Sequence, residues 1–259
     1  MPGRDDRDAG ATLTALSPAG EDVEAVTLVR ALDLSAGGRD GRPRTVGIMI
    51  ASIDGRAAVH GRSVALGCPA DRALLRALRA EADAILVGSA TLVAERYANL
   101  LDPAQRRDRD RCGRPEHPLL ATVSRRLDID RGAVPAFGEP GVASVIFTEL
   151  PGATDGSDPI AVHRMAPGAL TLTSVLERLA SSHGVRSVTC EGGPTLLGRL
   201  VAEDCLDDLL LTISPLLAGS SDGAPTIMGS SAPPVPAGLA LADLHRAGDH
   251  LFLHYARRA

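Results

Sequence analysis

Aromatic side chains are scarce in this 259-residue chain, which contains no tryptophan, two tyrosines and three phenylalanines. Proteins that bind single-stranded nucleic acid stack bases on aromatic rings and present a basic surface. The formal net charge here is −5, so both features are missing and we expect no nucleic-acid partner. With so few rings, the core must be built mainly from Leu, Val, Ile and Ala.

Long apolar runs are also missing. No stretch approaches the roughly 20 residues that span a bilayer, and the first residues lack the basic-then-apolar pattern of a signal sequence. Four cysteines (Cys68, Cys112, Cys190 and Cys205) are scattered without a C-x-x-C pair, which indicates reduced thiols rather than disulfides or a zinc site. Together these absences favour a cytoplasmic protein that makes no membrane contact.

Several catalytic patterns are absent as well. The seven histidines are isolated, with no partner at metal-ligand spacing, so we expect no metal. There is no G-x-S-x-G elbow and no zinc-deaminase signature. Asp207 and Asp208 are adjacent, but they open a predicted strand and should point to opposite sides. Hydride transfer suits a site that has neither a nucleophile nor a metal, because a bound cofactor carries that chemistry.

Glycines follow predicted buried strands at two places. A strand over residues 185–190 leads into Gly192 and Gly193 and then into a helix that starts at or just before Pro194. A strand over residues 81–88 leads into Gly88 and a short helix. Such junctions bring backbone N–H groups and a helix N-terminus to an anion. A tight turn with nothing bound fits the first junction equally well, and the second junction taken alone is weak evidence. Two junctions in one sheet favour a dinucleotide.

The remaining pattern predicts an α/β fold. Strands alternate with helices and the chain ends in two strands that read as an antiparallel hairpin, which indicates a three-layer α/β/α sandwich around a mixed, mostly parallel sheet. Residues 1–43 read as a leader with a possible short helix over 21–34, and residues 44–259 as a single domain. Strands are predicted at 45–53, 57–60, 81–88, 118–123, 143–148, 160–165, 185–190, 206–214, 239–246 and 250–256, helices at 69–79, 88–97, 172–182 and 194–202, and a solvated loop at 102–116.

Three segments in register resemble the reductases of riboflavin biosynthesis. They are ASIDGR at 51–56, RAEADAILVGSAT at 79–91 and EGGPTL at 191–196, and LDDL at 206–209 and SPLLAG at 214–219 extend the match. The resemblance covers roughly residues 44 to 256 and implies a dihydrofolate-reductase-like fold. It also implies an NADPH-dependent enzyme, expected as a homodimer, that reduces the ribose of a ribosylamino-pyrimidine 5′-phosphate to ribityl by delivering hydride to C1′.

The resemblance also implies site residues. Asp54 and Glu191 are expected to be catalytic, with Asp54 orienting substrate amino groups or moving a proton, although Asp-Gly is also simply a turn. Arg79 is a candidate partner of the 5′-phosphate. Apart from the resemblance, we expect Arg125 or Arg126 to pair with the cofactor 2′-phosphate, because a guanidinium fork suits that anion. The substrate set is Ser63, Arg79 and Glu191. The cofactor set is Ile50, Thr91, Glu95, Ser124, Gly192, Gly193, Pro194, Thr195, Leu196, Leu197 and Gly198.

Departures from the family pattern lie on the substrate side. Residues 95–97 read Glu-Arg-Tyr where the family usually has Asp-Asp-Pro, and Ala65 stands where relatives often carry an aromatic residue. The downstream arginine that often meets substrate phosphate has no clear counterpart. A pterin reductase of the same fold, with Asp54 facing the ring, therefore stays open. So does a nucleotide-binding homologue that has lost turnover.

Overall fold

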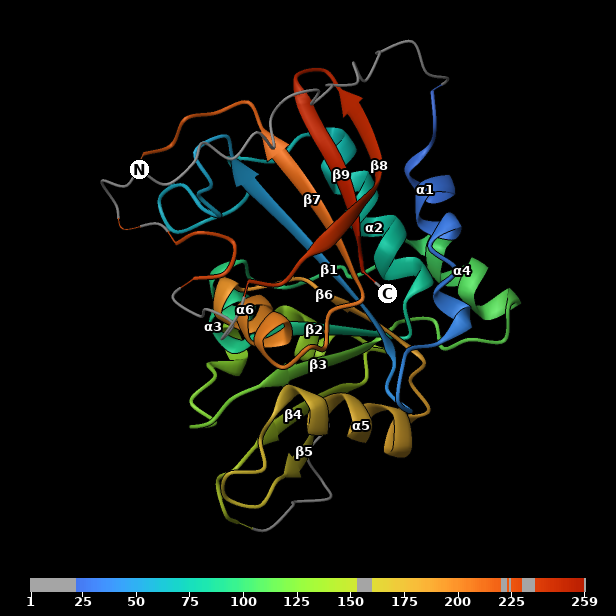
Figure 1. Ribbon diagram of the computed structural model, residues 1–259. Coiled ribbons are helices and arrows are strands. Elements are labelled where there is room, and N and C mark those ends of the chain that lie inside the picture. Colours follow the sequence, from blue (N-terminus) through green and yellow to red (C-terminus); the bar gives the residue numbers. More distant parts are fainter. Residues whose placement is uncertain (1–21, 153–159, 220–222, 224, 230–235, 259) are drawn as a thin grey trace, which may run out of the picture.

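The computed structural model describes residues 22–152, 160–219, 223, 225–229 and 236–258, so the predicted leader up to residue 21 and much of the segment 219–238 lie outside the described residues. Its centre is a nine-stranded sheet with the order β5-β4-β3-β2-β6-β1-β7-β9-β8 (Figure 1). The strands are β1 Arg44–Ser52, β2 Ala84–Gly88, β3 Leu119–Val123, β4 Ser144–Thr148, β5 Ile160–Arg164, β6 Ser187–Cys190, β7 Asp208–Ser214, β8 Leu239–Ala247 and β9 His250–Arg257.

Strand direction follows the predicted scheme. The strands β5, β4, β3, β2, β6, β1 and β7 are parallel, whereas β9 runs antiparallel to β7 and β8 antiparallel to β9. The mixed, mostly parallel sheet with a C-terminal antiparallel hairpin is thus confirmed. Because β1, β2, β6 and β7 are parallel, their carboxyl ends meet at one rim of the sheet, where α/β proteins bind ligands.

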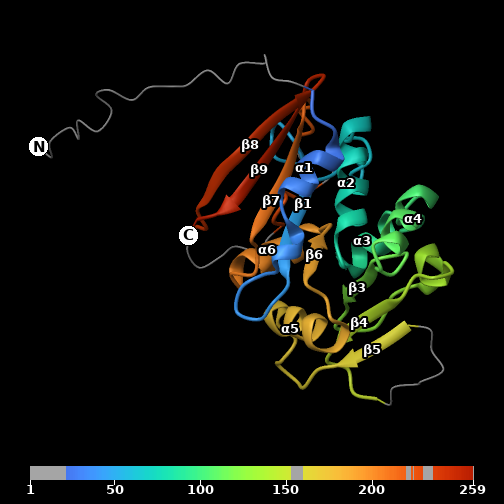
Figure 2. The ribbon, with the colours of Figure 1, turned by 90° about the vertical axis from the view of Figure 1, so that its right-hand side faces the viewer.

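Helices cover both faces of the sheet, which confirms the three layers (Figure 2). On one face α5 and α6 bury leucines and valines against β2, β3, β4, β6 and β7. On the other face α1 and α2 pack over β1, β7 and β9, and α3 packs farther along over β2. The helices are α1 Ala25–Ala31, α2 Pro69–Glu81, α3 Ser89–Ala94, α4 Pro103–Arg111, α5 Leu172–His183 and α6 Pro194–Ala202. Within the described residues, no helix has the length and apolar character to cross a membrane.

The short helix expected within the leader is part of the folded body. It spans Ala25–Ala31, packs against α2, and is followed by a 3₁₀ turn over Leu34–Ala36. Val29, Leu32 and Leu34 are buried in the same cluster as the leucines of α2. Residues 25–36 therefore contribute to the core and are not merely a tail attached to β1.

Two local predictions are wrong. Residues 102–116 were expected to be a solvated loop, but Pro103–Arg111 is a helix that begins with a capping box between Asp102 and Gln105. High polarity hid this helix, because its buried contact is made by the guanidinium of Arg109 rather than by an apolar stripe. Residues 57–60 form no regular strand; single bridges join Arg56 to Thr226 and Val59 to Arg62 instead.

Arg109 ties α4 to the end of α2. Its side chain is 3% exposed and donates to the carbonyl oxygens of Ala80, Ala82 and Pro115 at 2.7 to 2.9 Å. Burial lowers the pKa of Arg109 to about 10, which leaves it charged at neutral pH. We predict that Arg109→Leu lowers the free energy of unfolding by about 2–3 kcal/mol, because charged hydrogen bonds to buried carbonyls are lost. Urea denaturation measures this, and a loss as small as that of the exposed control Arg107→Leu would contradict it.

His254 of β9 joins the hairpin to the parallel sheet. Its Nε2 lies 2.9 Å from Oδ1 of the buried Asp208 on β7, and its Nδ1 lies 3.4 Å from Asp243 on β8. Arg44 holds the other oxygen of Asp208 at 2.8 Å. The hydrogen bond to Asp208 raises the pKa of His254 above its ordinary 6.5, against the opposing effect of burial.

The raised pKa of His254 predicts pH-dependent stability. A histidine with a raised folded-state pKa stabilises fully below its unfolded-state value, and the contribution is lost as pH rises through the folded-state pKa. Urea unfolding should therefore show the stabilising contribution of His254 falling as the pH rises above the ordinary histidine pKa of 6.5. His254→Gln should remove that part of the slope. An equal slope in the variant and the native protein would contradict the assignment.

Candidate functional site

The two glycine junctions meet at the rim of the sheet, because β2 and β6 are neighbouring parallel strands. The N–H of Gly88 donates to the carbonyl oxygen of Gly192 at 2.8 Å. A Cβ at Gly193 would lie 2.6 Å from Thr91 Oγ1, and a Cβ at Gly88 would lie 3.2 Å from the Gly193 nitrogen. Gly192 has φ +82°. Glycine is therefore required here for a close approach of two chain segments, and the turns are more than simple strand ends.

The bend between β6 and α6 offers unpaired donors. Its Gly192–Gly193 peptide bond is cis. Leu196 and Leu197 donate their backbone N–H groups to the carbonyl oxygen of Gly193. Among the described residues, the N–H groups of Gly193 and Thr195 have no hydrogen-bond acceptor. Both belong to the first turn or the cap of a nine-residue helix, where the helix dipole favours an anion.

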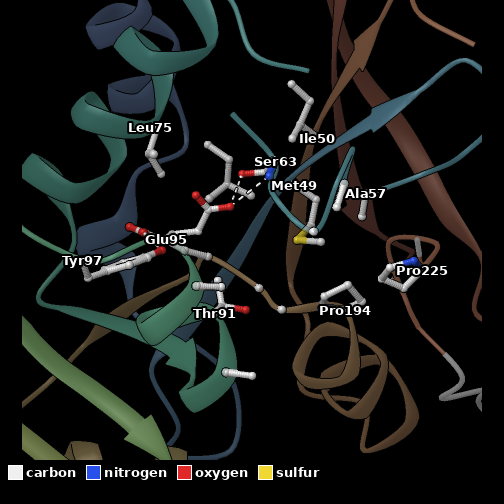
Figure 3. Close-up of a pocket in the computed structure, with 18 of the residues that line it drawn as sticks. Met49, Ile50, Ala57, Ser63, Leu75, Thr91, Glu95, Tyr97, Pro194 and Pro225 are labelled. Carbon is white, nitrogen blue, oxygen red and sulfur yellow. Dashed lines mark hydrogen bonds between the residues drawn. The ribbon is translucent and has the colours of Figure 1, made fainter. Parts of the chain in front are cut away.

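A cavity of about 320 Å³ opens beside this bend (Figure 3). Apolar residues of β1 and α2 form much of its wall, and polar groups come from α2, α3, the segment after α3, the loop 57–63 and the β6–α6 bend. Among the described residues that line it, none is a lysine or an arginine. The lining includes Ile48, Met49, Ile50, Ala57, Ser63, Asp71, Leu75, Thr91, Glu95, Tyr97, Glu191, Gly192, Gly193, Pro194 and Pro225.

Glu191 is locked in place at the floor of this site. The guanidinium of Arg79 donates hydrogen bonds to both carboxylate oxygens, at 2.6 and 2.8 Å, and the hydroxyl of Tyr97 donates to one of them at 2.7 Å. The guanidinium of Arg79 also stacks over the Tyr97 ring at 5.1 Å. Burial opposes the charge of Arg79, but Glu191 outweighs it and raises the Arg79 pKa; burial and Glu191 together raise the pKa of Tyr97. Arg79 therefore stays charged and Tyr97 stays neutral at neutral pH.

Glu95 and Ser63 form a second polar pair in the cavity wall (Figure 3). The carboxylate of Glu95 accepts from both the backbone N–H and the hydroxyl of Ser63, at 2.9 and 3.0 Å. The guanidinium of Arg62 lies 3.6 Å from its other oxygen. A residue expected to bind cofactor and one expected to bind substrate are therefore direct partners, and the carboxylate orders the loop that carries Ser63.

Asp71 and Tyr97 are pocket residues that the sequence reasoning missed. Asp71 lies in the first turn of α2, lines the cavity and accepts a 2.8 Å hydrogen bond from Thr212 of β7. Burial raises the Asp71 pKa, against the effect of Thr212. No local pattern marks either residue, because each reaches the cavity only through packing against distant strands. The sequence signal that could have indicated Asp71 is its spacing of four residues from Leu75, which places both side chains on one face of α2.

Asp54 lies outside the cavity lining. Its carboxylate accepts from the Ser52 hydroxyl at 2.6 Å and from the backbone N–H groups of Ala218 and Gly219 at 2.9 and 2.7 Å. These bonds, led by the one from Ser52, lower the pKa of Asp54 to about 2. The structure thus places Asp54 as an anchor between the β1 turn and the segment after β7, where it stays ionised and is a poor proton donor.

Other expected site residues also lie away from the cavity. Leu196, Leu197 and Gly198 are buried among the core leucines behind α6. Ser124 is buried at the end of β3, where its hydroxyl accepts from the N–H of Leu127. The expected residues that do line the cavity are Ile50, Ser63, Thr91, Glu95, Glu191, Gly192, Gly193 and Pro194.

Four further expected residues lie at the margins of the site. Thr195 is exposed at the start of α6. Arg79 meets the cavity only through Glu191 and Tyr97. Arg125 and Arg126 are exposed just beyond β3.

The thiol that directly precedes Glu191 is not a nucleophile. Cys190 ends β6 one residue before Glu191 and is fully buried. Burial raises the pKa of its thiol to about 12, so the reactive thiolate is not populated at neutral pH. The arrangement as a whole offers anion-binding amides, fixed carboxylates and an apolar wall, which suits binding and orientation more than covalent catalysis.

Comparisons with known proteins show the family to which the chain belongs. Residues 46–251 match the family model described as the RibD C-terminal domain. The 2,5-diamino-6-ribosylamino-4(3H)-pyrimidinone 5′-phosphate reductase of Archaeoglobus fulgidus is 27% identical over 206 residues, covering 72% of this chain and 86% of that protein. The riboflavin biosynthesis protein RibD of Mycobacterium tuberculosis is 31% identical over 183 residues, covering 70% of this chain and 44% of that protein.

A solved structure supports the same assignment. A pyrimidine reductase-like protein from Corynebacterium diphtheriae superposes with a TM-score of 0.77 at 25% identity, covering 90% of this chain and 98% of that one. The chain spans less than half the length of the M. tuberculosis RibD protein. The match over residues 46–251 and the shared architecture confirm the resemblance drawn from the sequence, and the chain belongs to the RibD C-terminal domain family, with its dihydrofolate-reductase-like fold.

Proposed function

We propose that this protein is an NADPH-dependent reductase that converts the ribosylamino group of a pyrimidine 5′-phosphate into a ribitylamino group. One observation carries the proposal: the two glycine junctions are in close contact beside the cavity, at the carboxyl ends of the adjacent parallel strands β2 and β6. Dinucleotides bind at this position in open α/β sheets. The relative from Archaeoglobus fulgidus is named for a reduction of this type.

The residues of the bend fit a nicotinamide dinucleotide. The unpaired N–H groups of Gly193 and Thr195 and the hydroxyl of Thr91 would hold the diphosphate, since amides at a helix start favour anions. Ile50 and Pro194, which line the cavity, would bound the nicotinamide end. When bound, the reduced nicotinamide supplies the hydride that C1′ of the substrate accepts.

The chain's own residues bind, orient and exclude water. Glu191, fixed by Arg79 and Tyr97, holds the start of the glycine bend, so the donors that follow it are pre-positioned. Glu95 keeps Ser63 at the cavity edge. The apolar wall of β1 and α2 keeps water from the reacting carbon. We assign Asp54 the role of a turn anchor and remove it from the catalytic set, because its bonds face the segment after β7.

A pterin reductase is a second candidate, and the absence of cationic residues favours it. Among the described residues lining the cavity there is no lysine or arginine to meet a 5′-phosphate. Arg79, the expected phosphate partner, is already paired with Glu191 through both carboxylate oxygens. A pterin ring carries no phosphate and therefore needs no cationic residue in the cavity wall.

An absorbance assay of NADPH oxidation tests these candidates. The purified protein is incubated with NADPH and, in turn, the phosphoribosylamino-pyrimidines and a dihydropterin. We expect oxidation with a phosphoribosylamino-pyrimidine, faster with NADPH than with NADH. Oxidation with the pterin alone would favour the second candidate, and NADPH binding without oxidation by any of them would indicate a nucleotide-binding homologue. We also propose a homodimer, which light scattering measures.

A further inference from the structure

Two histidines meet at the β5 edge of the sheet. His163 lies on β5, the last strand on that side, and His183 ends α5. Their Nε2 atoms are 2.9 Å apart. The two residues are 20 positions apart in the sequence, so no local spacing indicates them as a pair, and the expectation of isolated histidines does not hold here. The pair lies outside the lining of the cavity beside the glycine bend.

Packing fixes both rings. The ring of His163 stacks on Phe147 of β4, with centroids 5.2 Å apart and planes inclined by 18°, and Phe147 is fully buried. The helix α5 is anchored to the sheet by its buried leucines and lies beside β4 and β5 (Figure 1). His183 meets His163 edge-on, with centroids 5.1 Å apart and planes at 75°. The two imidazoles therefore face each other from rigid elements.

Both imidazoles are available as metal ligands. Within the described residues, neither ring has a hydrogen-bond partner other than the other ring. Burial lowers the pKa of His163, as do the neighbouring His183 and Arg178, and burial lowers the pKa of His183. Histidine binds metal in its neutral form, and the lowered pKa values keep both rings neutral at neutral pH.

The separation of the two nitrogens fits coordination of one ion. Imidazole nitrogens lie about 2.0–2.1 Å from zinc. Two nitrogens bound to one ion at a right angle, as in square-planar copper or nickel sites, are then about 2.9 Å apart, and at the tetrahedral angle about 3.3 Å. The observed 2.9 Å matches the first arrangement and is within a small ring rotation of the second. No third histidine, cysteine or carboxylate in the described part of the chain joins the pair, so water would complete the coordination.

We propose that His163 and His183 form a binding site for a divalent first-row transition metal, Zn²⁺, Ni²⁺ or Cu²⁺, which links the edge strand β5 to α5. In the free protein one ring donates an N–H···N hydrogen bond to the other. On metal binding its proton moves to Nδ1, and both Nε2 atoms coordinate the ion. The carboxyl end of α5 favours a positive charge, whereas Arg178 opposes one. The site is independent of the proposed reductase activity.

Isothermal titration with the metal chlorides measures the affinity. The full chain is used without a histidine tag, and Cys112→Ser is included in every protein because an exposed thiol also binds these ions. We expect one equivalent of each of the three ions to bind, with Cu²⁺ tightest, in the order that nitrogen ligands give. Mg²⁺ should not bind, because it prefers oxygen ligands. The electron paramagnetic resonance spectrum of the Cu²⁺ complex should show coupling to two nitrogens.

Substitution of either histidine separates coordination from packing. His163→Asn and His183→Asn should each weaken Cu²⁺ binding at least about 100-fold, since the loss of an outer partner of a ligand already costs up to about 100-fold. His60→Asn changes an exposed histidine of the loop after β1 and serves as the matched control. Zn²⁺ should raise the melting temperature of the control and of the Cys112→Ser protein equally, and should leave that of the other two variants unchanged. A cooperative unfolding transition without metal verifies that each variant is folded.

Three results would overturn the site: no binding of any of the three ions, equal Cu²⁺ affinities in the His163→Asn and His60→Asn proteins, or equally tight binding of Mg²⁺. Each would leave the pair as a hydrogen bond between neutral rings. None of them bears on NADPH oxidation, which the absorbance assay tests separately.

Discussion

Replacing Glu191 with glutamine is expected to lower the free energy of unfolding by about 3–5 kcal/mol, because it leaves the Arg79 guanidinium charged, buried and unpaired. The side chains of Arg79 and Glu191 are only 11% and 2% exposed, so water does not replace the lost charge. Glutamine retains the shape of the side chain and one acceptor for Tyr97. The loss is therefore electrostatic, and urea denaturation measures it.

Two control variants give the scale for the destabilisation expected of Glu191→Gln. Asp108→Asn breaks an exposed ion pair with Arg111 and should change the free energy of unfolding by no more than about 0.5 kcal/mol. Tyr97→Phe removes one hydrogen bond to Glu191 and should cost about 1–2 kcal/mol. If Glu191→Gln were as mild as Asp108→Asn, the buried pair would not be the structural centre of the site.

Replacing Gly193 with alanine is expected to weaken NADPH binding on the order of 100-fold, because a displacement near 1 Å at a binding group has effects of this size. The new Cβ would lie 2.6 Å from Thr91 Oγ1, a separation that forces either the bend or α3 to move. Both segments hold proposed diphosphate contacts, so either movement disturbs the anion site. Fluorescence titration with NADPH measures the change.

Gly138→Ala is the matched control, because a Cβ at Gly138 meets nothing within 4 Å. That variant should bind NADPH as the native protein does. The clash in Gly193→Ala should also lower the melting temperature. The double variant Gly193→Ala with Thr91→Ala lacks the clashing hydroxyl, so its melting temperature should lie closer to the native value than that of Gly193→Ala. Native NADPH affinity in Gly193→Ala would show that the bend does not hold the cofactor.

Much of the architecture follows from local sequence patterns. Buried strands of Val, Ile and Leu with helices between them predict parallel neighbours, and parallel neighbours bring their carboxyl ends together. For that reason the junctions at Gly88 and Gly192 could be expected at one site before any coordinates. The capping box at Asp102 was also visible in the sequence, yet the lack of apolar residues after it concealed α4.

The substrate side of the site depends on contacts between distant residues. Tyr97 reaches Glu191 across 94 positions of sequence, and Thr212 reaches Asp71 across 141. No periodicity or spacing encodes such pairs. For Asp54 the family pattern predicts a part in the chemistry, and the structure adds that its carboxylate accepts hydrogen bonds from the turn after β1 and from the segment after β7.

The central claim is that the bend from Glu191 to Thr195, pressed against Thr91, holds the diphosphate of a nicotinamide dinucleotide. A crystal structure of the protein with NADP⁺ tests it directly. The account predicts diphosphate oxygens within hydrogen-bond distance of the N–H groups of Gly193 and Thr195, with the nicotinamide in the cavity beside Ile50. A dinucleotide bound away from this bend, or no bound dinucleotide at saturating concentration, would contradict it.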